Sequence, residues 1–265
     1  MARKKRIIAC VGDTHVGSRY SLFPEGFRSR EGNDISAQMS EEQFKLLEYW
    51  QDFVKRADDM GVDTVFLLGD LIQGSHRAEG SRELLTADLD EQMEAAIKLL
   101  EPLCKGRKVA AVSGTKYHQS FDMRVHKLIA ERLGGKYFGR MGNIKLKGTG
   151  VKVRILHGSS RASIYRSSVM DREILFQRAA EALKKVPSVK AIIAAHWHWY
   201  AHLELEDRHW IQVPAWMAWF PWEETGYARM QPSIGGVFLT VTSDRIEVER
   251  VIYAQVHIAD KVEEI

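Results

Sequence analysis

Carboxylate and imidazole side chains recur along this chain, each shortly after an apolar run. They stand in the segments GDTHVG, FLLGDLIQG, RILHG and IIAAHWHWY. The candidate ligands in these segments are Asp13, His15, Asp70, His157, His196 and His198. Carboxylates and imidazoles without thiolates suit Mn, Fe, Zn, Co or Ni rather than a structural zinc site. The set therefore predicts a catalytic metal centre assembled from distant segments.

Two carboxylates and four histidines exceed what one catalytic ion with an open position can use, so we expect two divalent ions. Two metal ions about 3.5–4 Å apart need a bridging carboxylate, and they hold between them a water whose pKa falls toward about 7. Such a water is a nucleophile at neutral pH, and it faces a substrate oxygen that both ions polarise. We expect manganese, with iron, zinc, cobalt and nickel as alternatives.

The apolar runs that precede the candidate ligands are short and rich in β-forming residues. Their ranges are 6–11, 64–68, 108–112, 151–156 and 189–194. Helical patterns lie between most of them, which predicts an α/β fold. Because the carboxyl ends of neighbouring parallel strands converge on one crevice, residues that are scattered in the sequence can meet there.

Four amphipathic helices are expected. The clearest begins with the capping box SEEQ at Ser40 to Gln43, buries Phe44, Leu47, Val54 and Ala57, and stops at Gly61. The second covers residues 87–103 with a stripe of Leu89, Met93, Ile97 and Leu100. The third carries Phe121, Val125, Leu128 and Ile129 and ends at Gly134, and the fourth covers 169–185.

After His198 the pattern changes to paired strands. The expected ranges are 201–206 with 209–213 and 237–242 with 245–252. We find no internal repeat and no linker, so residues 1–265 are expected to form a single domain. Two segments without periodicity, 19–38 and 73–82, follow candidate ligands and are expected to be lid or substrate loops.

Composition is that of an ordinary globular protein. The 265 residues are 45% hydrophobic and carry a net charge of +3, which by itself does not argue for nucleic-acid binding. Two cysteines, Cys10 and Cys104, cannot build a disulfide framework, so we expect a cytoplasmic setting. The basic start with IIACVG is too short for a signal peptide, and no segment reaches the roughly 18 apolar residues of a membrane helix.

The motifs D-x-H, G-D, G-x-x-x-H, H-G and H-x-H, in this order, resemble the calcineurin-like metallophosphoesterase family. The likeness spans residues 8 to about 213 and, with the closing strands, nearly the whole chain. It implies a four-layer α/β/β/α sandwich, in which two mixed sheets pack face to face between helices. It further implies a dinuclear metal centre that hydrolyses phosphomonoesters or phosphodiesters.

The resemblance also implies a role for each candidate ligand. Asp13, His15 and His198 would hold one ion, Asp70 would bridge, and His157 and His196 would hold the other. Gly12, Gly69 and Gly114 would let the backbone come close to the metals.

The chain departs from the family at one motif. The usual Gly-Asn-His, whose Asn binds the second metal, is replaced by Gly114-Thr115-Lys116-Tyr117-His118. Thr115 is therefore expected to be a weak metal ligand, a ligand through water, or a residue that shapes the turn. His118 has three candidate roles: protonating the leaving oxygen, stabilising the charge on phosphorus, or binding the second ion. We expect the first two together.

Substrate contacts are expected from basic residues in loops. Arg161 and Arg166 in SSRASIYRSS, and His76 with Arg77 in the second loop, could meet phosphate oxygens, or they could be solvated charges. The aromatic segment WMAWFPW at residues 216–222 could stack nucleobases, form the contact of a homodimer, or pack in the core.

The sequence thus favours a two-metal phosphoesterase that attacks phosphorus with a metal-bridging hydroxide. We expect a phosphodiesterase or nuclease acting on DNA or RNA, with a phosphomonoesterase or nucleotide phosphatase as the alternative. A non-catalytic metal-binding scaffold of the same fold is the other alternative. The chain has no G-x-x-x-x-G-K-[ST], G-x-S-x-G or H-E-x-x-H motif, which argues against other hydrolase designs.

Overall fold

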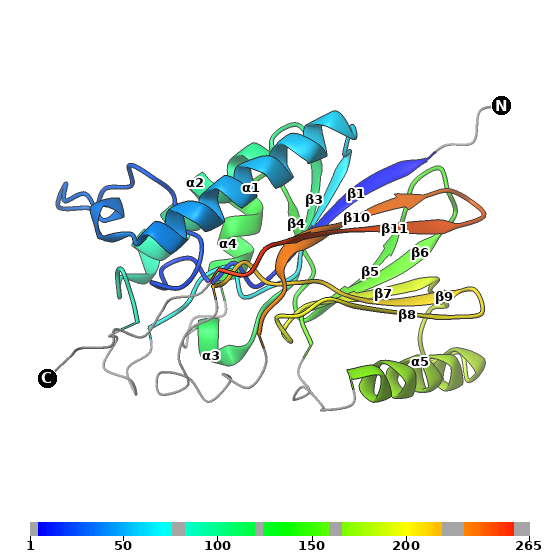
Figure 1. Ribbon diagram of the computed structural model, residues 1–265. Coiled ribbons are helices and arrows are strands. Elements are labelled where there is room, and N and C mark those ends of the chain that lie inside the picture. Colours follow the sequence, from blue (N-terminus) through cyan, green and yellow to red (C-terminus); the bar gives the residue numbers. More distant parts are fainter. Residues whose placement is uncertain (1–4, 76–82, 120–123, 159–165, 219–230, 257–265) are drawn as a thin grey trace, which may run out of the picture.

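Two β-sheets form the centre of the protein (Figure 1). The computed structural model describes residues 5–75, 83–119, 124–158, 166–218 and 231–256. The first sheet has the strand order β11-β10-β1-β2-β3-β4 and the second β5-β6-β7-β9-β8. The first sheet consists of β1 (Arg6–Val11), β2 (Thr64–Leu67), β3 (Lys108–Ala111), β4 (Lys136–Tyr137), β10 (Ile234–Val241) and β11 (Ile246–Tyr253). The second consists of β5 (Met141–Lys145), β6 (Lys152–Leu156), β7 (Ala191–Ala194), β8 (Ala201–Leu205) and β9 (Arg208–Gln212).

Both sheets are mixed, and the candidate ligands follow strands of their parallel parts. β1, β2, β3 and β4 run parallel in the first sheet, whereas β10 and β11 run antiparallel to their neighbours. In the second sheet β6, β7 and β9 run parallel, and β5 and β8 are antiparallel edges. The carboxyl ends of five strands that precede candidate site residues therefore lie at one end of the sandwich.

Helices cover the two outer faces of the sandwich (Figure 1). Their bounds are η1 (Ser36–Gln38), α1 (Glu41–Asp59), α2 (Leu89–Cys104), α3 (Lys116–Gln119), α4 (Val125–Arg132) and α5 (Arg166–Ala182). α1 begins with the expected capping box, in which Ser40 and Gln43 each accept from the other's backbone amide. No helix in the described part of the chain combines the length and apolar character needed to cross a membrane.

Three separate hydrophobic clusters fill the three spaces between layers. One packs α1, α2 and α4 against the first sheet, one lies between the sheets, and one packs α5 against the second sheet. β1 contributes to two of them because side chains alternate along a strand: Ile7, Ala9 and Val11 face the helices, and Ile8 and Cys10 face the other sheet. The expected α/β/β/α sandwich is confirmed.

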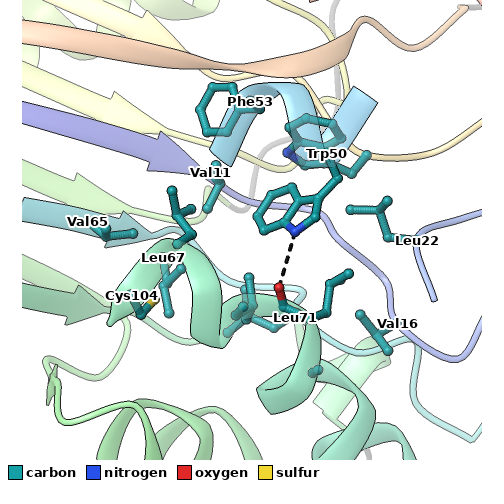
Figure 2. Close-up of a cluster of buried hydrophobic side chains, with 14 of the residues drawn as sticks. Val11, Val16, Leu22, Trp50, Phe53, Val65, Leu67, Leu71 and Cys104 are labelled. Atoms are coloured by element: carbon teal, nitrogen blue, oxygen red, sulfur yellow. Dashed lines mark hydrogen bonds between the residues drawn. The ribbon is translucent and has the colours of Figure 1, made fainter. Parts of the chain in front are cut away.

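The helix-side cluster is anchored by tryptophan (Figure 2). The indole of Trp50 in α1 lies among Val16, Leu22 and Leu71, and its N–H donates to the carbonyl of Leu99 in α2 at 3.1 Å. This bond fixes the two helices to each other while the ring fills the core. Trp216 packs edge-on against Trp50 with 4.9 Å between ring centroids and is fully buried. Of the three readings of the aromatic segment, core packing is the one that applies to Trp216.

Several local expectations were wrong. Phe44 and Leu128 are 40% and 42% exposed rather than buried. In α2 Leu100 is buried as expected, but Leu89, Met93 and Ile97 are only partly buried against the core. The most buried face includes Ala95, Leu99 and Leu103, so it is rotated from the expected stripe. The alanines on this face allow α2 to approach the sheet closely. A pattern search that looks only for large apolar residues misses them. Strands β4 and β5 were not expected.

Candidate metal centre

The candidate ligands follow the ends of strands from both sheets. Asp13 and His15 follow β1, Asp70 follows β2, His157 follows β6, and His196 with His198 follow β7. Backbone hydrogen bonds continue past the strands and tie these loops together. The amides of Asp13 and His15 donate to the carbonyls of Gly69 and Asp70 at 3.0 Å, and the amide of Ala195 donates to His157 at 3.1 Å. These bonds join the loops in pairs within each sheet, and the amide of His196 links the pairs into one rim by donating to Asp13 Oδ2 at 2.8 Å.

The backbone at this rim is unusual. Among the described non-glycine residues, φ is positive at Asp13, His15, Asp70, His196 and His198, and otherwise only at Lys184 and Glu206. A residue with a side chain enters this region at a cost of about 1–3 kcal/mol. Such strain persists only where the surroundings impose it, and it gathers at functional sites. Here the five strained residues are all candidate ligands.

The side chains that the sequence singled out as ligands converge. One group whose ligand atoms all lie within 4.8 Å of one another is Asp13, His15 and His198, and another is Asp70, His157 and His196. A third group of the same kind, His15, Asp70 and His118, overlaps both. The sequence assigned the first two groups to two ions on the basis of a resemblance, and the geometry brings the same residues together.

The surroundings of Asp13 suit a bound cation. Its Oδ1 is buried without a hydrogen-bond partner among the described residues, 3.6 Å from His198 Nε2 and 3.8 Å from His15 Nε2. A buried carboxylate oxygen without a partner carries a large desolvation cost, which a bound cation offsets. Asp70 differs, because its Oδ2 lies 2.8 Å from Nε2 of His157, whose raised pKa makes the contact an ion pair in the metal-free protein.

Fixed acceptors orient three of the imidazoles. His15 Nδ1 lies 2.9 Å from the side-chain oxygen of Gln73, His157 Nδ1 2.7 Å from the carbonyl of Leu68, and His118 Nδ1 2.8 Å from the carbonyl of Gln73. A carbonyl only accepts, so Nδ1 carries the proton in His157 and His118. Nε2 of each ring then faces the centre, which is the arrangement that metal-binding histidines require.

The charges of the centre are shifted by burial and by one another. Burial lowers the pKa of His15, His196 and His198, and neighbouring imidazoles lower it further. Burial alone would lower the pKa of His157, but the carboxylates of Asp70 and Asp13 raise it to about 9. Burial raises the pKa of Asp13 to about 7. Burial would also raise that of Asp70, yet His157 and His118 hold it well below its usual range.

Thr115 lies directly against the candidate bridging carboxylate. Its amide donates to Asp70 Oδ1 at 2.7 Å, and its hydroxyl lies 3.2 and 3.1 Å from Oδ1 and Oδ2. Gly114 makes this approach feasible, because a Cβ there would stand 1.9 Å from Asp70 Oδ1. At Gly12 the missing Cβ serves packing instead, since it would stand 2.8 Å from the Cβ of Ala195. That Thr115 also binds a metal stays a prediction.

His118 stands at the edge of the centre. Its Nε2 is 4.0 Å from Asp70 Oδ2, its side chain is 15% exposed, and its ring meets that of His15 edge-on with centroids 4.4 Å apart. It lies in α3, a single turn that the sequence pattern did not predict. The position suits either a group that contacts substrate or a further ligand.

Sequence reasoning missed the residues that support the ligands from behind. His126 in α4 is fully buried, and its Nε2 accepts the amide of Leu71 at 3.0 Å, next to Asp70. Burial lowers the pKa of His126 to about 4, so the ring is a neutral acceptor. Gln92 donates to the carbonyl of Gly74 at 3.1 Å and accepts its amide at 2.8 Å. His126 and Gln92 are polar residues on otherwise apolar helix faces, and that pattern in the sequence could have marked them as supporting residues.

The expected substrate residues and loops are covered only in part. His76, Arg77 and Arg161 lie outside the described residues, and so does the side chain of Arg166, the first residue of α5. The segment 19–38 is held in place at its start, where Gln43 donates to the carbonyls of Ser18 and Ser21 at 3.1 and 2.9 Å. Only 73–75 of the second loop is described. A lid role for either segment stays a prediction.

Comparison with known proteins identifies the fold. No protein-family model and no curated protein matches this sequence. Among solved structures, an archaeal phosphodiesterase is similar over 92% of this chain and 99% of its own, with 13% identity and a TM-score of 0.50.

Two further solved structures are similar at lower scores. Vps29 from Entamoeba histolytica in complex with zinc matches 93% of this chain and 98% of its own, with 16% identity and a TM-score of 0.46. A predicted phosphoesterase from Streptococcus pneumoniae matches 94% of this chain and 100% of its own, with 11% identity and a TM-score of 0.39. With its two mixed sheets and its carboxylate and imidazole clusters at the strand ends, this chain has the calcineurin-like metallophosphoesterase fold.

Proposed function

We propose that this protein is a divalent-metal-dependent phosphoesterase and that phosphodiesters are its preferred substrates. The observation that carries the proposal is the pair of buried ligand groups at the strand ends, with Asp70 and His15 also common to the third, overlapping group. A fold alone hosts many functions, whereas a converging set of carboxylates and imidazoles defines chemistry. The archaeal protein with this fold is a phosphodiesterase, which supports the same class of reaction.

In this proposal the chain supplies two adjoining ion sites. Asp13, His15 and His198 would hold one divalent ion, His157 and His196 would hold the other, and Asp70 would serve both. When bound, the two ions activate a water for in-line attack and polarise the phosphoryl oxygens. Manganese is the ion we propose, and the absence of thiolates among the ligands suits it.

Asp70 is held ready for the bridging role by groups on both sides. The amide of Thr115 donates to its Oδ1 at 2.7 Å, and His126 holds the amide of the next residue, Leu71, at 3.0 Å. The carboxylate therefore cannot rotate freely, and its Oδ2 stays 2.8 Å from Nε2 of His157. In our proposal Thr115 acts mainly by positioning Asp70, and any bond to a metal is secondary.

His118 is proposed to contact the scissile phosphate. Its Nδ1 proton is committed to the carbonyl of Gln73, so Nε2 is the atom that faces the centre. A proton held at Nε2 stabilises the negative charge that develops on the phosphoryl oxygens and passes to the leaving oxygen. The third ligand group, which includes His118, leaves metal binding as the competing role.

The preference for diesters, and for DNA or RNA among them, rests on sequence features. These are the basic start at Arg3 to Arg6 and the two arginines Arg161 and Arg166. Trp216 contributes nothing to it, because its ring is buried against Trp50 and Phe53. A phosphomonoesterase with the same metal centre is the alternative within this fold.

Hydrolysis assays with added Mn²⁺ test the proposal. Single- and double-stranded DNA, RNA, an aryl phosphodiester and an aryl phosphomonoester are compared, each with wild-type protein and with Asp70→Asn. We expect diester cleavage that Asp70→Asn abolishes. Rapid monoester turnover with inert diesters would reverse the substrate preference. Tight metal binding without turnover of any ester from pH 5 to 9 would show that the protein is a non-catalytic metal-binding scaffold rather than an enzyme.

A further inference from the structure

A second group of imidazole and carboxylate side chains lies on the hairpin of β8 and β9. Side chains alternate along a strand, so His202 and Glu204 of β8 point to one face of the sheet. Glu204 is paired directly with His209 of β9, which places the third side chain on the same face. The opposite face of β8 carries Leu203 and Leu205, which pack toward α5.

The three side chains are close enough to bind one ion. Their ligand atoms all lie within 4.8 Å of one another. His202 Nε2 and His209 Nδ1 are 3.0 Å apart, and the two rings are nearly parallel with 5.3 Å between centroids. Two nitrogens bound to one tetrahedral zinc at about 2.0–2.1 Å stand roughly 3.3 Å apart. In the metal-free hairpin these two nitrogens hydrogen-bond to each other, so a bound ion would replace that bond and draw in the carboxylate of Glu204, which offers an oxygen within 4.8 Å of both.

The hairpin group is accessible and shares no residue with the centre at the strand ends. His202 and Glu204 are exposed, and His209 is buried at 7% exposure. The buried histidine is a fixed ligand, and the two exposed side chains can change rotamer to bind an ion that arrives from solution. His209 is fixed further by the backbone, since its amide donates to the carbonyl of Lys190 at 3.0 Å.

We propose that His202, Glu204 and His209 form a second, separate binding site for a divalent transition-metal ion of the zinc class. Two imidazoles and one carboxylate are a ligand set that zinc accepts while keeping a fourth position for water. β8 is the edge strand of its sheet, and an ion held across the hairpin ties this edge to β9.

Zinc titration of chelator-treated protein tests the site. Bound Zn²⁺ is measured by equilibrium dialysis for wild-type protein, His202→Asn, Glu204→Gln and the matched control Glu249→Gln, an exposed carboxylate of β11. We expect His202→Asn to bind one equivalent less than wild type and Glu204→Gln to bind that equivalent at least tenfold more weakly. Glu249→Gln should bind as wild type does, and ester hydrolysis should be unchanged in all three. Equal stoichiometry and affinity in wild type and both hairpin variants overturns the proposal.

The same titration in an Asp70→Asn background separates this inference from the proposed function. In Asp70→Asn, less Zn²⁺ should bind at the strand-end centre. The one equivalent of Zn²⁺ bound at the hairpin should remain, and adding His202→Asn should remove it. Co²⁺ gives a second readout, because a paramagnetic ion at the hairpin shifts the imidazole resonances of His202 and His209. Unshifted His202 and His209 resonances at saturating Co²⁺ would also overturn the proposal, whatever the activity of the protein.

Discussion

The centre at the strand ends and the group on the β8–β9 hairpin contain the same kinds of side chain in opposite settings. The first gathers residues from Asp13 to His198, buries most of them and holds five at positive φ. The second gathers residues within one hairpin, leaves two exposed, and uses regular strand geometry. The pairing of two strands in one hairpin is enough to bring ligands together, whereas a cluster that is also buried and oriented requires the whole fold.

The two regions also differ in what holds the ligands in place. At the strand ends, Gln73, Leu68 and Thr115 each accept from or donate to a ligand. At the hairpin, the two rings contact each other across the strands. Supporting hydrogen bonds fix tautomer and direction and thereby strengthen metal binding. We therefore expect chemistry at the strand-end centre and only metal binding at the hairpin group.

The largest expected effect comes from Asp70→Asn. The amide keeps the shape of the carboxylate but removes the charge that Asp70 brings to the group with His157 and His196 and to the overlapping group with His15 and His118. Metal content should fall, and ester hydrolysis should fall to background, because both ions lose a ligand. Metal analysis and turnover measure this, with the exposed Asp59→Asn as control. Full activity in Asp70→Asn would contradict the view that the strand-end centre is catalytic and the hairpin group is not.

His118→Ala separates catalysis from metal binding. We expect turnover to fall by about 10²–10⁴-fold with nearly unchanged metal content, since His118 is proposed to act on the phosphate rather than on an ion. Turnover and bound metal are measured on the same preparation, with Lys127→Ala as a surface control. Loss of one metal equivalent would assign His118 as a ligand instead.

Gly114→Ala tests how closely the loops must approach. Its added Cβ would stand 1.9 Å from Asp70 Oδ1, so the carboxylate must move. We expect metal affinity at the strand ends to fall by about 10–100-fold, by analogy with loss of a group that orients a ligand. The hairpin should bind as before. Competition with a chromophoric chelator measures both affinities, and an unchanged strand-end affinity would show that the loops can relax.

The pH dependence of metal uptake should differ between the regions. His157 has a pKa of about 9 and donates Nδ1–H to Leu68, so at pH 7 the metal-free ring carries its second proton on Nε2. An ion must displace that proton, and strand-end affinity should rise about tenfold per unit from pH 7 to 9. Burial lowers the pKa of His202 and His209, so hairpin uptake should stay constant over that range. Isothermal titration at several pH values checks this, and two parallel curves would contradict it.

Regular elements could be predicted closely from the sequence. β1 has the expected bounds, and the capping box at Ser40 and Gln43 marks the start of α1. The rotation of the buried face of α2 could not be predicted, because Ala95 and Ala96 are buried through close packing rather than through strong hydrophobicity. Short elements such as α3 and β4 leave no periodic signal.

The sequence by itself determined which residue types follow each strand, and hence the candidate ligands and the class of chemistry that we propose for them. Only the tertiary structure decided their distances, the positive φ values and the unpaired Asp13 Oδ1. It also decided the supporting roles of Gln73, Thr115 and His126. The physical reason is that strand formation depends on local side-chain patterns, whereas burial and orientation at the strand ends depend on the packing of two sheets that are distant in sequence.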